Sequence, residues 1–430
     1  EYAGPLQTTL RDLAGWSSVR EYWFPNIRSL PGAIFVLSLT LYPYVYLLAR
    51  AAFRELPASG QDVARSLGLG HMRQFLRVSL PQARPAIAAG TAIVMMETLN
   101  DFGTVDYFAV QTLTTGIFSI WLESYDPGGA AQLALLAALI VAGLLGVEKI
   151  GRRRARFNKS GRQMAPIQPQ PLSSGQGAAV LVYCLVPIFL GFLSPLLVLV
   201  APVVSDFNLW HDPGLWRAAG HSLALGSLSA GLVVVLATVM VLGVRKISGA
   251  WKKSLLTLTT LGYAFPGAVL GLGILIPLAA FDNWLADLVF ATFRLDPGLL
   301  LTGTAGALII AYCVRFFAIG VGAAEAGLAT ISTNIPLAAS TLGHAPRDVV
   351  LNIYQPLMRG SLASAMVLVF VDTVKELPAT LLLRPFNFDT LSTHVYEQAS
   401  LENFHGSTPA ALLIITLSFG AIFLLAKAHR

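Results

Sequence analysis

Charged residues are scarce in this chain of 430 residues, where they make up 12% of the sequence. A typical soluble domain carries about 25%. Apolar residues make up 55% of the chain, and its mean hydropathy is +0.66. These values exclude a disordered chain, a coiled coil and an ordinary cytosolic enzyme. The composition therefore predicts an integral membrane protein.

Motifs for redox, metal and nucleotide chemistry are also missing. The two cysteines, Cys184 and Cys313, lie far apart and form no pair with metal-ligand spacing. The sequence has no Gly-x-x-x-x-Gly-Lys-Ser/Thr loop, no His-Glu-x-x-His and no Gly-x-Ser-x-Gly. We therefore expect no catalytic residue and no covalently bound cofactor. A net charge of +6 in so apolar a chain is typical of basic cytoplasmic loops rather than of a nucleic-acid partner.

Nine segments are predicted to cross the bilayer, which takes about 20 mostly apolar residues. Seven of them contain no acidic residue, lysine or arginine, and two shorter ones continue into apolar sequence interrupted by carboxylates. In chain order the nine predicted spans are 29–49, 85–96, 127–147, 178–205, 218–244, 254–281, 297–314, 360–371 and 406–426.

Basic residues fix one orientation for these spans. They cluster after the first, third, fifth and ninth span, with the largest group between Arg152 and Arg162. All of these groups fall on the cytoplasmic side if the chain enters the membrane from outside at residue 29, as the positive-inside rule requires. The sequence therefore predicts a multi-pass protein with a cytoplasmic C-terminus.

The two halves of the chain repeat each other in the register that aligns Ala64 with Ala339. Nine of the 35 positions between 64 and 98 are identical to their counterparts in the second half. In this register the second half holds six spans and the first half holds the last three of six. The repeat therefore predicts two permease halves, at 1–150 and 178–430, joined by a cytoplasmic linker at 151–177. It also predicts that roughly 100 further residues with three helices precede residue 1.

A cytoplasmic motif recurs in both halves, from Asp62 to Pro81 and from Leu337 to Pro356. It resembles the EAA loop of ABC importer permeases, which reads Glu-Ala-Ala, three residues, Gly, nine residues, Ile-x-Leu-Pro. Both copies keep this spacing. The departures are Asp62 and Leu337 in place of the glutamate, Val63 in place of an alanine, and Gln355 in place of the leucine.

The resemblance implies an all-α membrane protein with tandem type I ABC importer transmembrane domains. It also implies that each loop docks as a helix–turn–helix on a separate ATPase subunit, which uses the ATP. The left-handed conformation available to glycine suits Gly68 and Gly343 at the turn, and Pro346 suits the first turn of the next helix. The alternative is a plain amphipathic helix at the membrane surface. The expected coupling residues are Asp62, Ala64, Gly68, Leu80, Pro81, Ala338, Ala339, Gly343, Ile353 and Pro356.

Further segments narrow the resemblance to bacterial ferric iron permeases. They are 22–25, 28–32, 42–50, 96–105 and 113–117 in the first half and 372–380 and 386–391 in the second. The resemblance implies a bacterial inner-membrane location, two ATP-binding cassette subunits and a periplasmic iron-binding protein. Two alternatives stay open: the same importer class carrying another solute such as thiamine, and an ion-coupled secondary transporter, which would need no ATPase.

Four carboxylates occupy equivalent positions in the two halves. Glu97 and Asp101 are four residues apart, as are Asp372 and Glu376, so each pair is expected on one helix face. Acidic side chains at membrane depth usually face a pathway or a partner, and oxygen donors suit a hard cation such as Fe³⁺. The hypothesis is a translocation path, with no metal ligand assigned. The alternative is structural pairing, for example of Asp372 with Lys375.

Overall fold

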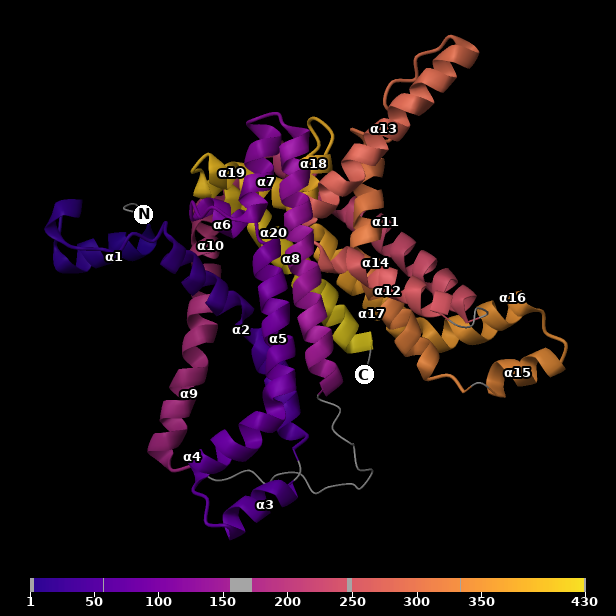
Figure 1. Ribbon diagram of the computed structural model, residues 1–430. Coiled ribbons are helices and arrows are strands. Elements are labelled where there is room, and N and C mark those ends of the chain that lie inside the picture. Colours follow the sequence, from indigo (N-terminus) through magenta and orange to yellow (C-terminus); the bar gives the residue numbers. More distant parts are fainter. Residues whose placement is uncertain (1–3, 57, 155–171, 246–249, 333, 429–430) are drawn as a thin grey trace. The chain divides into compact units, whose positions relative to one another are not determined.

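The computed structural model describes residues 4–56, 58–154, 172–245, 250–332 and 334–428, and within them the chain is helical without any strand (Figure 1). The all-α prediction is confirmed. The chain forms two compact units. One unit contains 1–115 and 136–198, and the other contains 116–135 and 199–430. The division predicted at residues 150 and 177 stays a prediction, and most of the expected linker lies outside the described residues.

Three helices run from one unit into the other: α7 (Leu113–Leu122), α8 (Pro127–Arg154) and α10 (Ser194–Ser205). The other elements of the first unit are α1 (Pro5–Ala14), η1 (Val19–Glu21), α2 (Leu30–Arg54), α3 (Ala58–Ser66), α4 (His71–Gln74), η2 (Phe75–Ser79), α5 (Leu80–Asn100), α6 (Gly103–Tyr107), α9 (Ser174–Ile188) and η3 (Phe189–Leu193).

The second unit is built around three mutually packed helices, α11, α14 and α17, and α20 packs against α17 and α11. Its elements are η4 (Phe207–His211), α11 (Pro213–Val244), α12 (Ala250–Ala264), α13 (Gly267–Phe293), α14 (Ala305–Ala329), α15 (Asn334–Thr341), α16 (Pro346–Val349), η5 (Val350–Tyr354), α17 (Gln355–Val374), α18 (Pro378–Leu383), α19 (Leu391–Ser400) and α20 (Phe404–Ala428).

Eight helical stretches in the described part of the chain are long and apolar enough to cross a membrane. The span predicted at 85–96 lies within α5, a 21-residue helix that is not among the eight, and its crossing of the membrane stays a prediction. One predicted span needs correction. The span predicted at 254–281 is two helices, because the chain breaks at Phe265 and Pro266; proline lacks the amide hydrogen that would continue α12.

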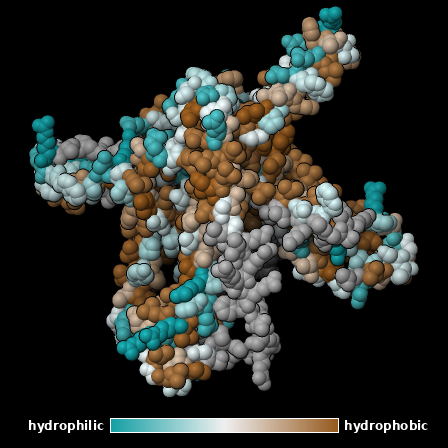
Figure 2. Space-filling view, viewed as in Figure 1, coloured by the Kyte–Doolittle hydropathy of each residue, from teal (hydrophilic) through white to brown (hydrophobic). Residues whose placement is uncertain are grey.

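Apolar side chains cover much of the visible surface of the long helices, for example α9, whereas hydrophilic ones gather on α1 and the far end of α13 (Figure 2). Such large exposed apolar surfaces are unfavourable in water and match the lipid-facing sides of membrane helices. The surface is therefore that of a multi-pass membrane protein.

The predicted repeat is present in the structure. Helix α2 begins at Leu30 and α14 at Ala305, which are equivalent positions in the repeat register. Helices α5 and α17 also begin at equivalent positions, Leu80 and Gln355. The same is true of two short π-helical segments, η2 and η5, which lead directly into α5 and α17. No propensity signals a π-helix, so the sequence pattern did not reveal these segments.

Small residues let neighbouring helices pack closely within each unit. At Gly90 of α5 an added Cβ would lie 2.7 Å from the Cα of Val45 in α2.

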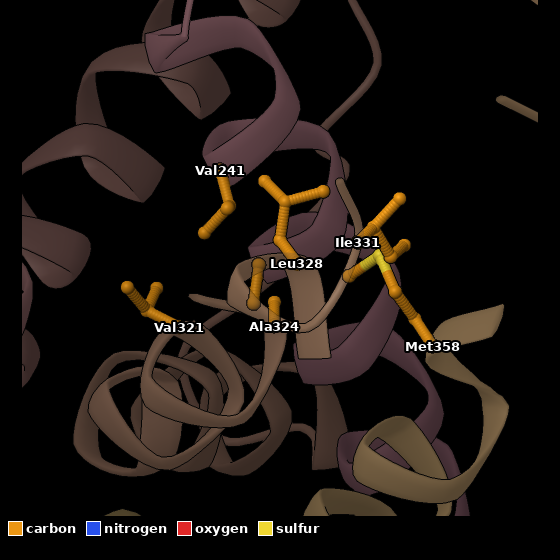
Figure 3. Close-up of a cluster of buried hydrophobic side chains, with 7 residues drawn as sticks. Val241, Val321, Ala324, Leu328, Ile331 and Met358 are labelled. Atoms are coloured by element: carbon orange, nitrogen blue, oxygen red, sulfur yellow. The ribbon is translucent and has the colours of Figure 1, made fainter. Parts of the chain in front are cut away.

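In the second unit, Val241, Val321, Ala324, Leu328, Ile331 and Met358 form most of a buried cluster from α11, α14, the residues after α14, and α17 (Figure 3). Tyr354 of η5 packs against this cluster. The base of the second predicted coupling loop therefore rests on the core.

Candidate functional site

The first predicted coupling loop is a helix–turn–helix. Helix α3 ends at Ser66, and Gly68 follows with φ of +74°. The amide of Leu69 donates to the carbonyl of Ala64 at 3.1 Å, which is the six-residue closure of a Schellman cap. Helix α4 begins two residues after Leu69 and continues through η2 into α5. The predicted left-handed turn at Gly68 is confirmed.

The second loop repeats this geometry. Gly343 has φ of +85°, and the amide of His344 donates to the carbonyl of Ala339 at 3.1 Å. Pro346 is the first residue of α16, as predicted. Because a side chain at positive φ is strained, both turns favour glycine.

The two loop helices bury an alanine and expose leucines. Ala64 and Ala339 are buried at equivalent positions. Leu67 and Leu342, also equivalent, are 74% and 79% exposed, and Leu337 is exposed as well. Isolated exposed leucines are common, but a leucine exposed at the same position in both copies is the pattern expected of an apolar contact surface.

The remaining predicted coupling residues lie on the loop helices or at the start of the helices behind the loops. Leu80 and Pro81 start α5, and Pro356 is the second residue of α17. Ile353 lies in η5. Asp62 and Ala338 are exposed on α3 and α15. The loop helix α3 packs on both α4 and η2, and α15 packs on α16. Each loop is thus joined mechanically to a long helix.

The predicted arrangement of the carboxylate pairs on one helix face is wrong. Helix α5 ends at Asn100 and α17 ends at Val374, so Asp101 and Glu376 lie beyond the helix ends. The pairs cannot share a face there because the helical spacing stops. Glu97 and Asp372 remain within their helices and are partly buried.

Asp101 and Glu376 instead cap the short helices that follow. The Asp101 carboxylate accepts hydrogen bonds from the amides of Thr104 and Val105, each at 3.0 Å. The Glu376 carboxylate accepts one from the amide of Ala379 at 3.1 Å. Carboxylates are favourable at helix N-termini, where amide donors are otherwise unsatisfied.

The backbone at these two positions is also held alike. The hydroxyl of Thr114 donates to the carbonyl of Asp101 at 2.9 Å. The hydroxyl of Ser392 donates to the carbonyl of Glu376 at 2.7 Å. The two halves therefore share a hydrogen bond as well as a sequence pattern. In each half, a hydroxyl from the start of α7 or α19 donates to the backbone carbonyl of the acidic residue that follows α5 or α17.

Arg315 is a site residue that sequence reasoning missed. Its Nε lies 3.1 Å from Oε2 of Glu376, and both side chains are at least nine-tenths buried. The predicted span at 297–314 stopped before Arg315, because spans were delimited by charge, whereas α14 continues to Ala329. The sequence did contain a signal for this pair. An arginine inside an apolar run needs a counter-charge, and the same half of the chain contains a carboxylate at membrane depth.

Asp372 has the pairing foreseen as the alternative to a transport role. The Nζ of Lys375 lies 2.9 Å from its carboxylate, and Lys375 is 56% exposed. Among the described residues no group of three or more His, Cys, Asp or Glu side chains is placed to hold a metal ion. A role of the four acids in a path stays a prediction.

Residues 23–156 match the family described as binding-protein-dependent transport system inner membrane component. This match includes the first coupling loop and Asp101. Together with the helical fold and the individual relatives, it makes the chain similar to the membrane permeases of ABC importers, which are not themselves enzymes.

Individual relatives are more specific. The chain is 27% identical over 402 residues to the Fe(3+)-transport system permease protein FbpB 2 of Haemophilus influenzae, covering 92% of this chain and 76% of that protein. It is 24% identical over 381 residues to the putative ferric transport system permease protein FbpB 1 of the same species, covering 83% and 56%. A thiamine transport system permease protein, ThiP of Haemophilus influenzae, is 25% identical over 232 residues, covering 52% and 42%. The chain thus spans about half the length of the last two.

Proposed function

We propose that this chain is the permease subunit of an ATP-driven importer for ferric iron, and that a periplasmic binding protein delivers the iron. One observation carries the proposal: the relatives described above that align with more than four-fifths of this chain are ferric permeases. The aligned region includes both halves, so the similarity exceeds the shared family segment.

The coupling loops give this importer its connection to ATP. Two ATPase subunits dock on the exposed faces of α3 and α15, and Leu67 and Leu342, each directly after its helix, supply apolar contacts. The chain contains no nucleotide-binding loop of its own. Closure of the ATPase dimer pushes α3 against η2 and α15 against α16, and these segments lead into α5 and α17. The membrane helices then move as rigid extensions of the loops.

The proposed orientation places both loops and the C-terminus in the cytoplasm of a bacterium, with the chain in the inner membrane. Basic residues support it, since Arg50, Arg54 and Arg245 stand at or just beyond the loop-side ends of α2 and α11. The ends of α5 and α17 that hold Asp101 and Glu376 then face the periplasm.

Binding-protein-stimulated ATPase activity tests the proposal. The complete transporter is reconstituted in vesicles with its ATPase, and the binding protein is added with Fe³⁺, with thiamine or empty. We expect Fe³⁺-loaded protein to stimulate ATP hydrolysis and ⁵⁵Fe uptake. Thiamine is the second candidate, favoured by the match over 232 residues. Stimulation only by the thiamine-loaded binding protein would show that thiamine is the cargo. Failure of any ATPase to copurify with the chain would show that it is not part of an ATP-driven importer.

A further inference from the structure

A cavity of about 180 Å³ opens in the second unit between the C-terminal ends of α11 and α14 and the middle of α12. Its apolar wall includes Val241, Leu256 and Leu328, and its two charged residues are Arg245 and Glu325. Val241 and Leu328 also belong to the buried cluster (Figure 3). The cavity therefore lies at the edge of a packed core, within one unit.

The two charges of the cavity are not paired with each other. Nη1 of Arg245 donates to the hydroxyl of Tyr354 at 3.1 Å, and the guanidinium lies 5.7 Å from the centre of that ring. Within the described part of the chain, neither Arg245 nor Glu325 has an ion-pair partner within 4.0 Å. One cation and one anion, held apart on the wall of one cavity, are complementary to a zwitterion.

The depth of the cavity points to a lipid. The membrane-spanning part of α11 ends at Val244, so Arg245 stands at the membrane surface. Trp251, one residue after the start of α12, is 75% exposed. Tryptophan in such a position is typical of the headgroup region. At about 180 Å³ the cavity is smaller than the roughly 300–1,000 Å³ of pockets for drug-sized ligands, and it suits a single headgroup.

We propose that this cavity binds the headgroup of a zwitterionic phospholipid, phosphatidylethanolamine. The phosphate accepts hydrogen bonds from Arg245, and the ammonium donates to the carboxylate of Glu325. The acyl chains leave along the apolar wall into the bilayer. Phosphatidylglycerol offers the phosphate without an ammonium, and phosphatidylcholine has no N–H to donate, so both fit less well. This site is independent of the cargo.

The headgroup also acts on the second coupling loop. Tyr354, the residue that Arg245 contacts, is the last residue of η5 and directly precedes α17. A phosphate on the guanidinium holds Arg245 in place over the Tyr354 ring. The lipid thereby stabilises the junction through which motion of α15 and α16 reaches the membrane.

Lipid retention by the purified, complete transporter tests the site. The complex is reconstituted in nanodiscs with equal amounts of phosphatidylethanolamine, phosphatidylglycerol and phosphatidylcholine, and bound lipid is counted by native mass spectrometry after exchange into detergent. We expect phosphatidylethanolamine to exceed each of the other two by about fivefold. Arg245→Gln lowers retention of phosphatidylethanolamine and phosphatidylglycerol by about fivefold. Glu325→Gln removes only the preference between these two lipids.

Matched controls keep the result specific. Asp287→Asn and Arg294→Gln remove exposed charges of the same kinds that do not line the cavity, and they leave retention unchanged. Equal retention of the three lipids by the wild type, or variants of Arg245 and Glu325 that behave like the controls, would overturn the proposal. Release of the lipid by soluble phosphoethanolamine at equal concentration would assign the cavity to a soluble zwitterion and overturn it too.

Discussion

Glu376 and Asp101 hold equivalent places in the two halves, but only Glu376 has an arginine beside it. Arg315 lies 3.1 Å from Glu376, whereas the residue of the first half that corresponds to Arg315 is Thr40. Asp101 depends on the amide and hydroxyl donors of α6 instead. Both halves therefore have a carboxylate helix cap, but an arginine supplies the counter-charge in one half and neutral hydrogen-bond donors stabilise the carboxylate in the other.

Breaking this ion pair should destabilise the protein strongly. Glu376→Gln leaves the Arg315 guanidinium buried without a counter-charge, and we expect a loss of about 3–5 kcal/mol in the free energy of unfolding. Asp372→Asn is the control, because Asp372 pairs with the exposed Lys375, and such pairs contribute less than about 1 kcal/mol. Thermal unfolding of the two variants in one detergent measures the difference. Similar melting temperatures would contradict the assignment of a buried pair.

The glycine turn of the first loop should be needed for coupling. Gly68→Ala places a Cβ at φ of +74°, which costs about 1–2 kcal/mol and deforms the turn. Gly70→Ala is a matched control, since an added Cβ meets nothing within 4 Å at either glycine and only Gly68 has positive φ. We expect Gly68→Ala, and not Gly70→Ala, to uncouple ATP hydrolysis from transport. Equal transport by both variants would show that the turn has no role in coupling.

The acids within α5 and α17 should act together if they line a path. Glu97→Gln combined with Asp372→Asn should slow iron uptake more than the two single effects predict, because either half can partly substitute for the other. Melting temperatures of the same four proteins should stay within a few degrees. A fall in stability that parallels the fall in uptake would show that the acids brace helices.

Thiol labelling checks the proposed orientation. After Cys184 and Cys313 are replaced by serine, single cysteines are introduced as Asn208→Cys and Asn334→Cys, both at exposed positions outside the long spans. An impermeant maleimide should label position 208 only from the periplasmic side and position 334 only from the cytoplasmic side. The opposite pattern would show that the chain has the reverse orientation, with both predicted coupling loops on the side of the membrane away from the ATPase.

The sequence predicted the features that depend on residues close together in the chain, such as the glycine turns, and missed those that depend on contacts between distant residues. Gly68 and Gly343 were placed correctly because a left-handed turn restricts the residue type. Arg315 was missed because a single charge in an apolar run shows no partner until the fold brings Glu376 beside it. The placement of Asp101 on a helix face was wrong for a similar reason. The helix ends there because the Asp101 side chain caps the next helix, and the spacing of residues in the sequence does not show such a cap.

The π-helical segments η2 and η5 have a geometric consequence for coupling. Each inserts one residue into an otherwise continuous α-helix, so side chains before and after it are out of phase by about 100°. Deleting one residue within Val350–Tyr354 would restore the α-helical phase and rotate α16 and the Gly343 turn about the axis of α17 by that angle. The loop would keep its sequence and its fold, yet it would present a different face to the ATPase.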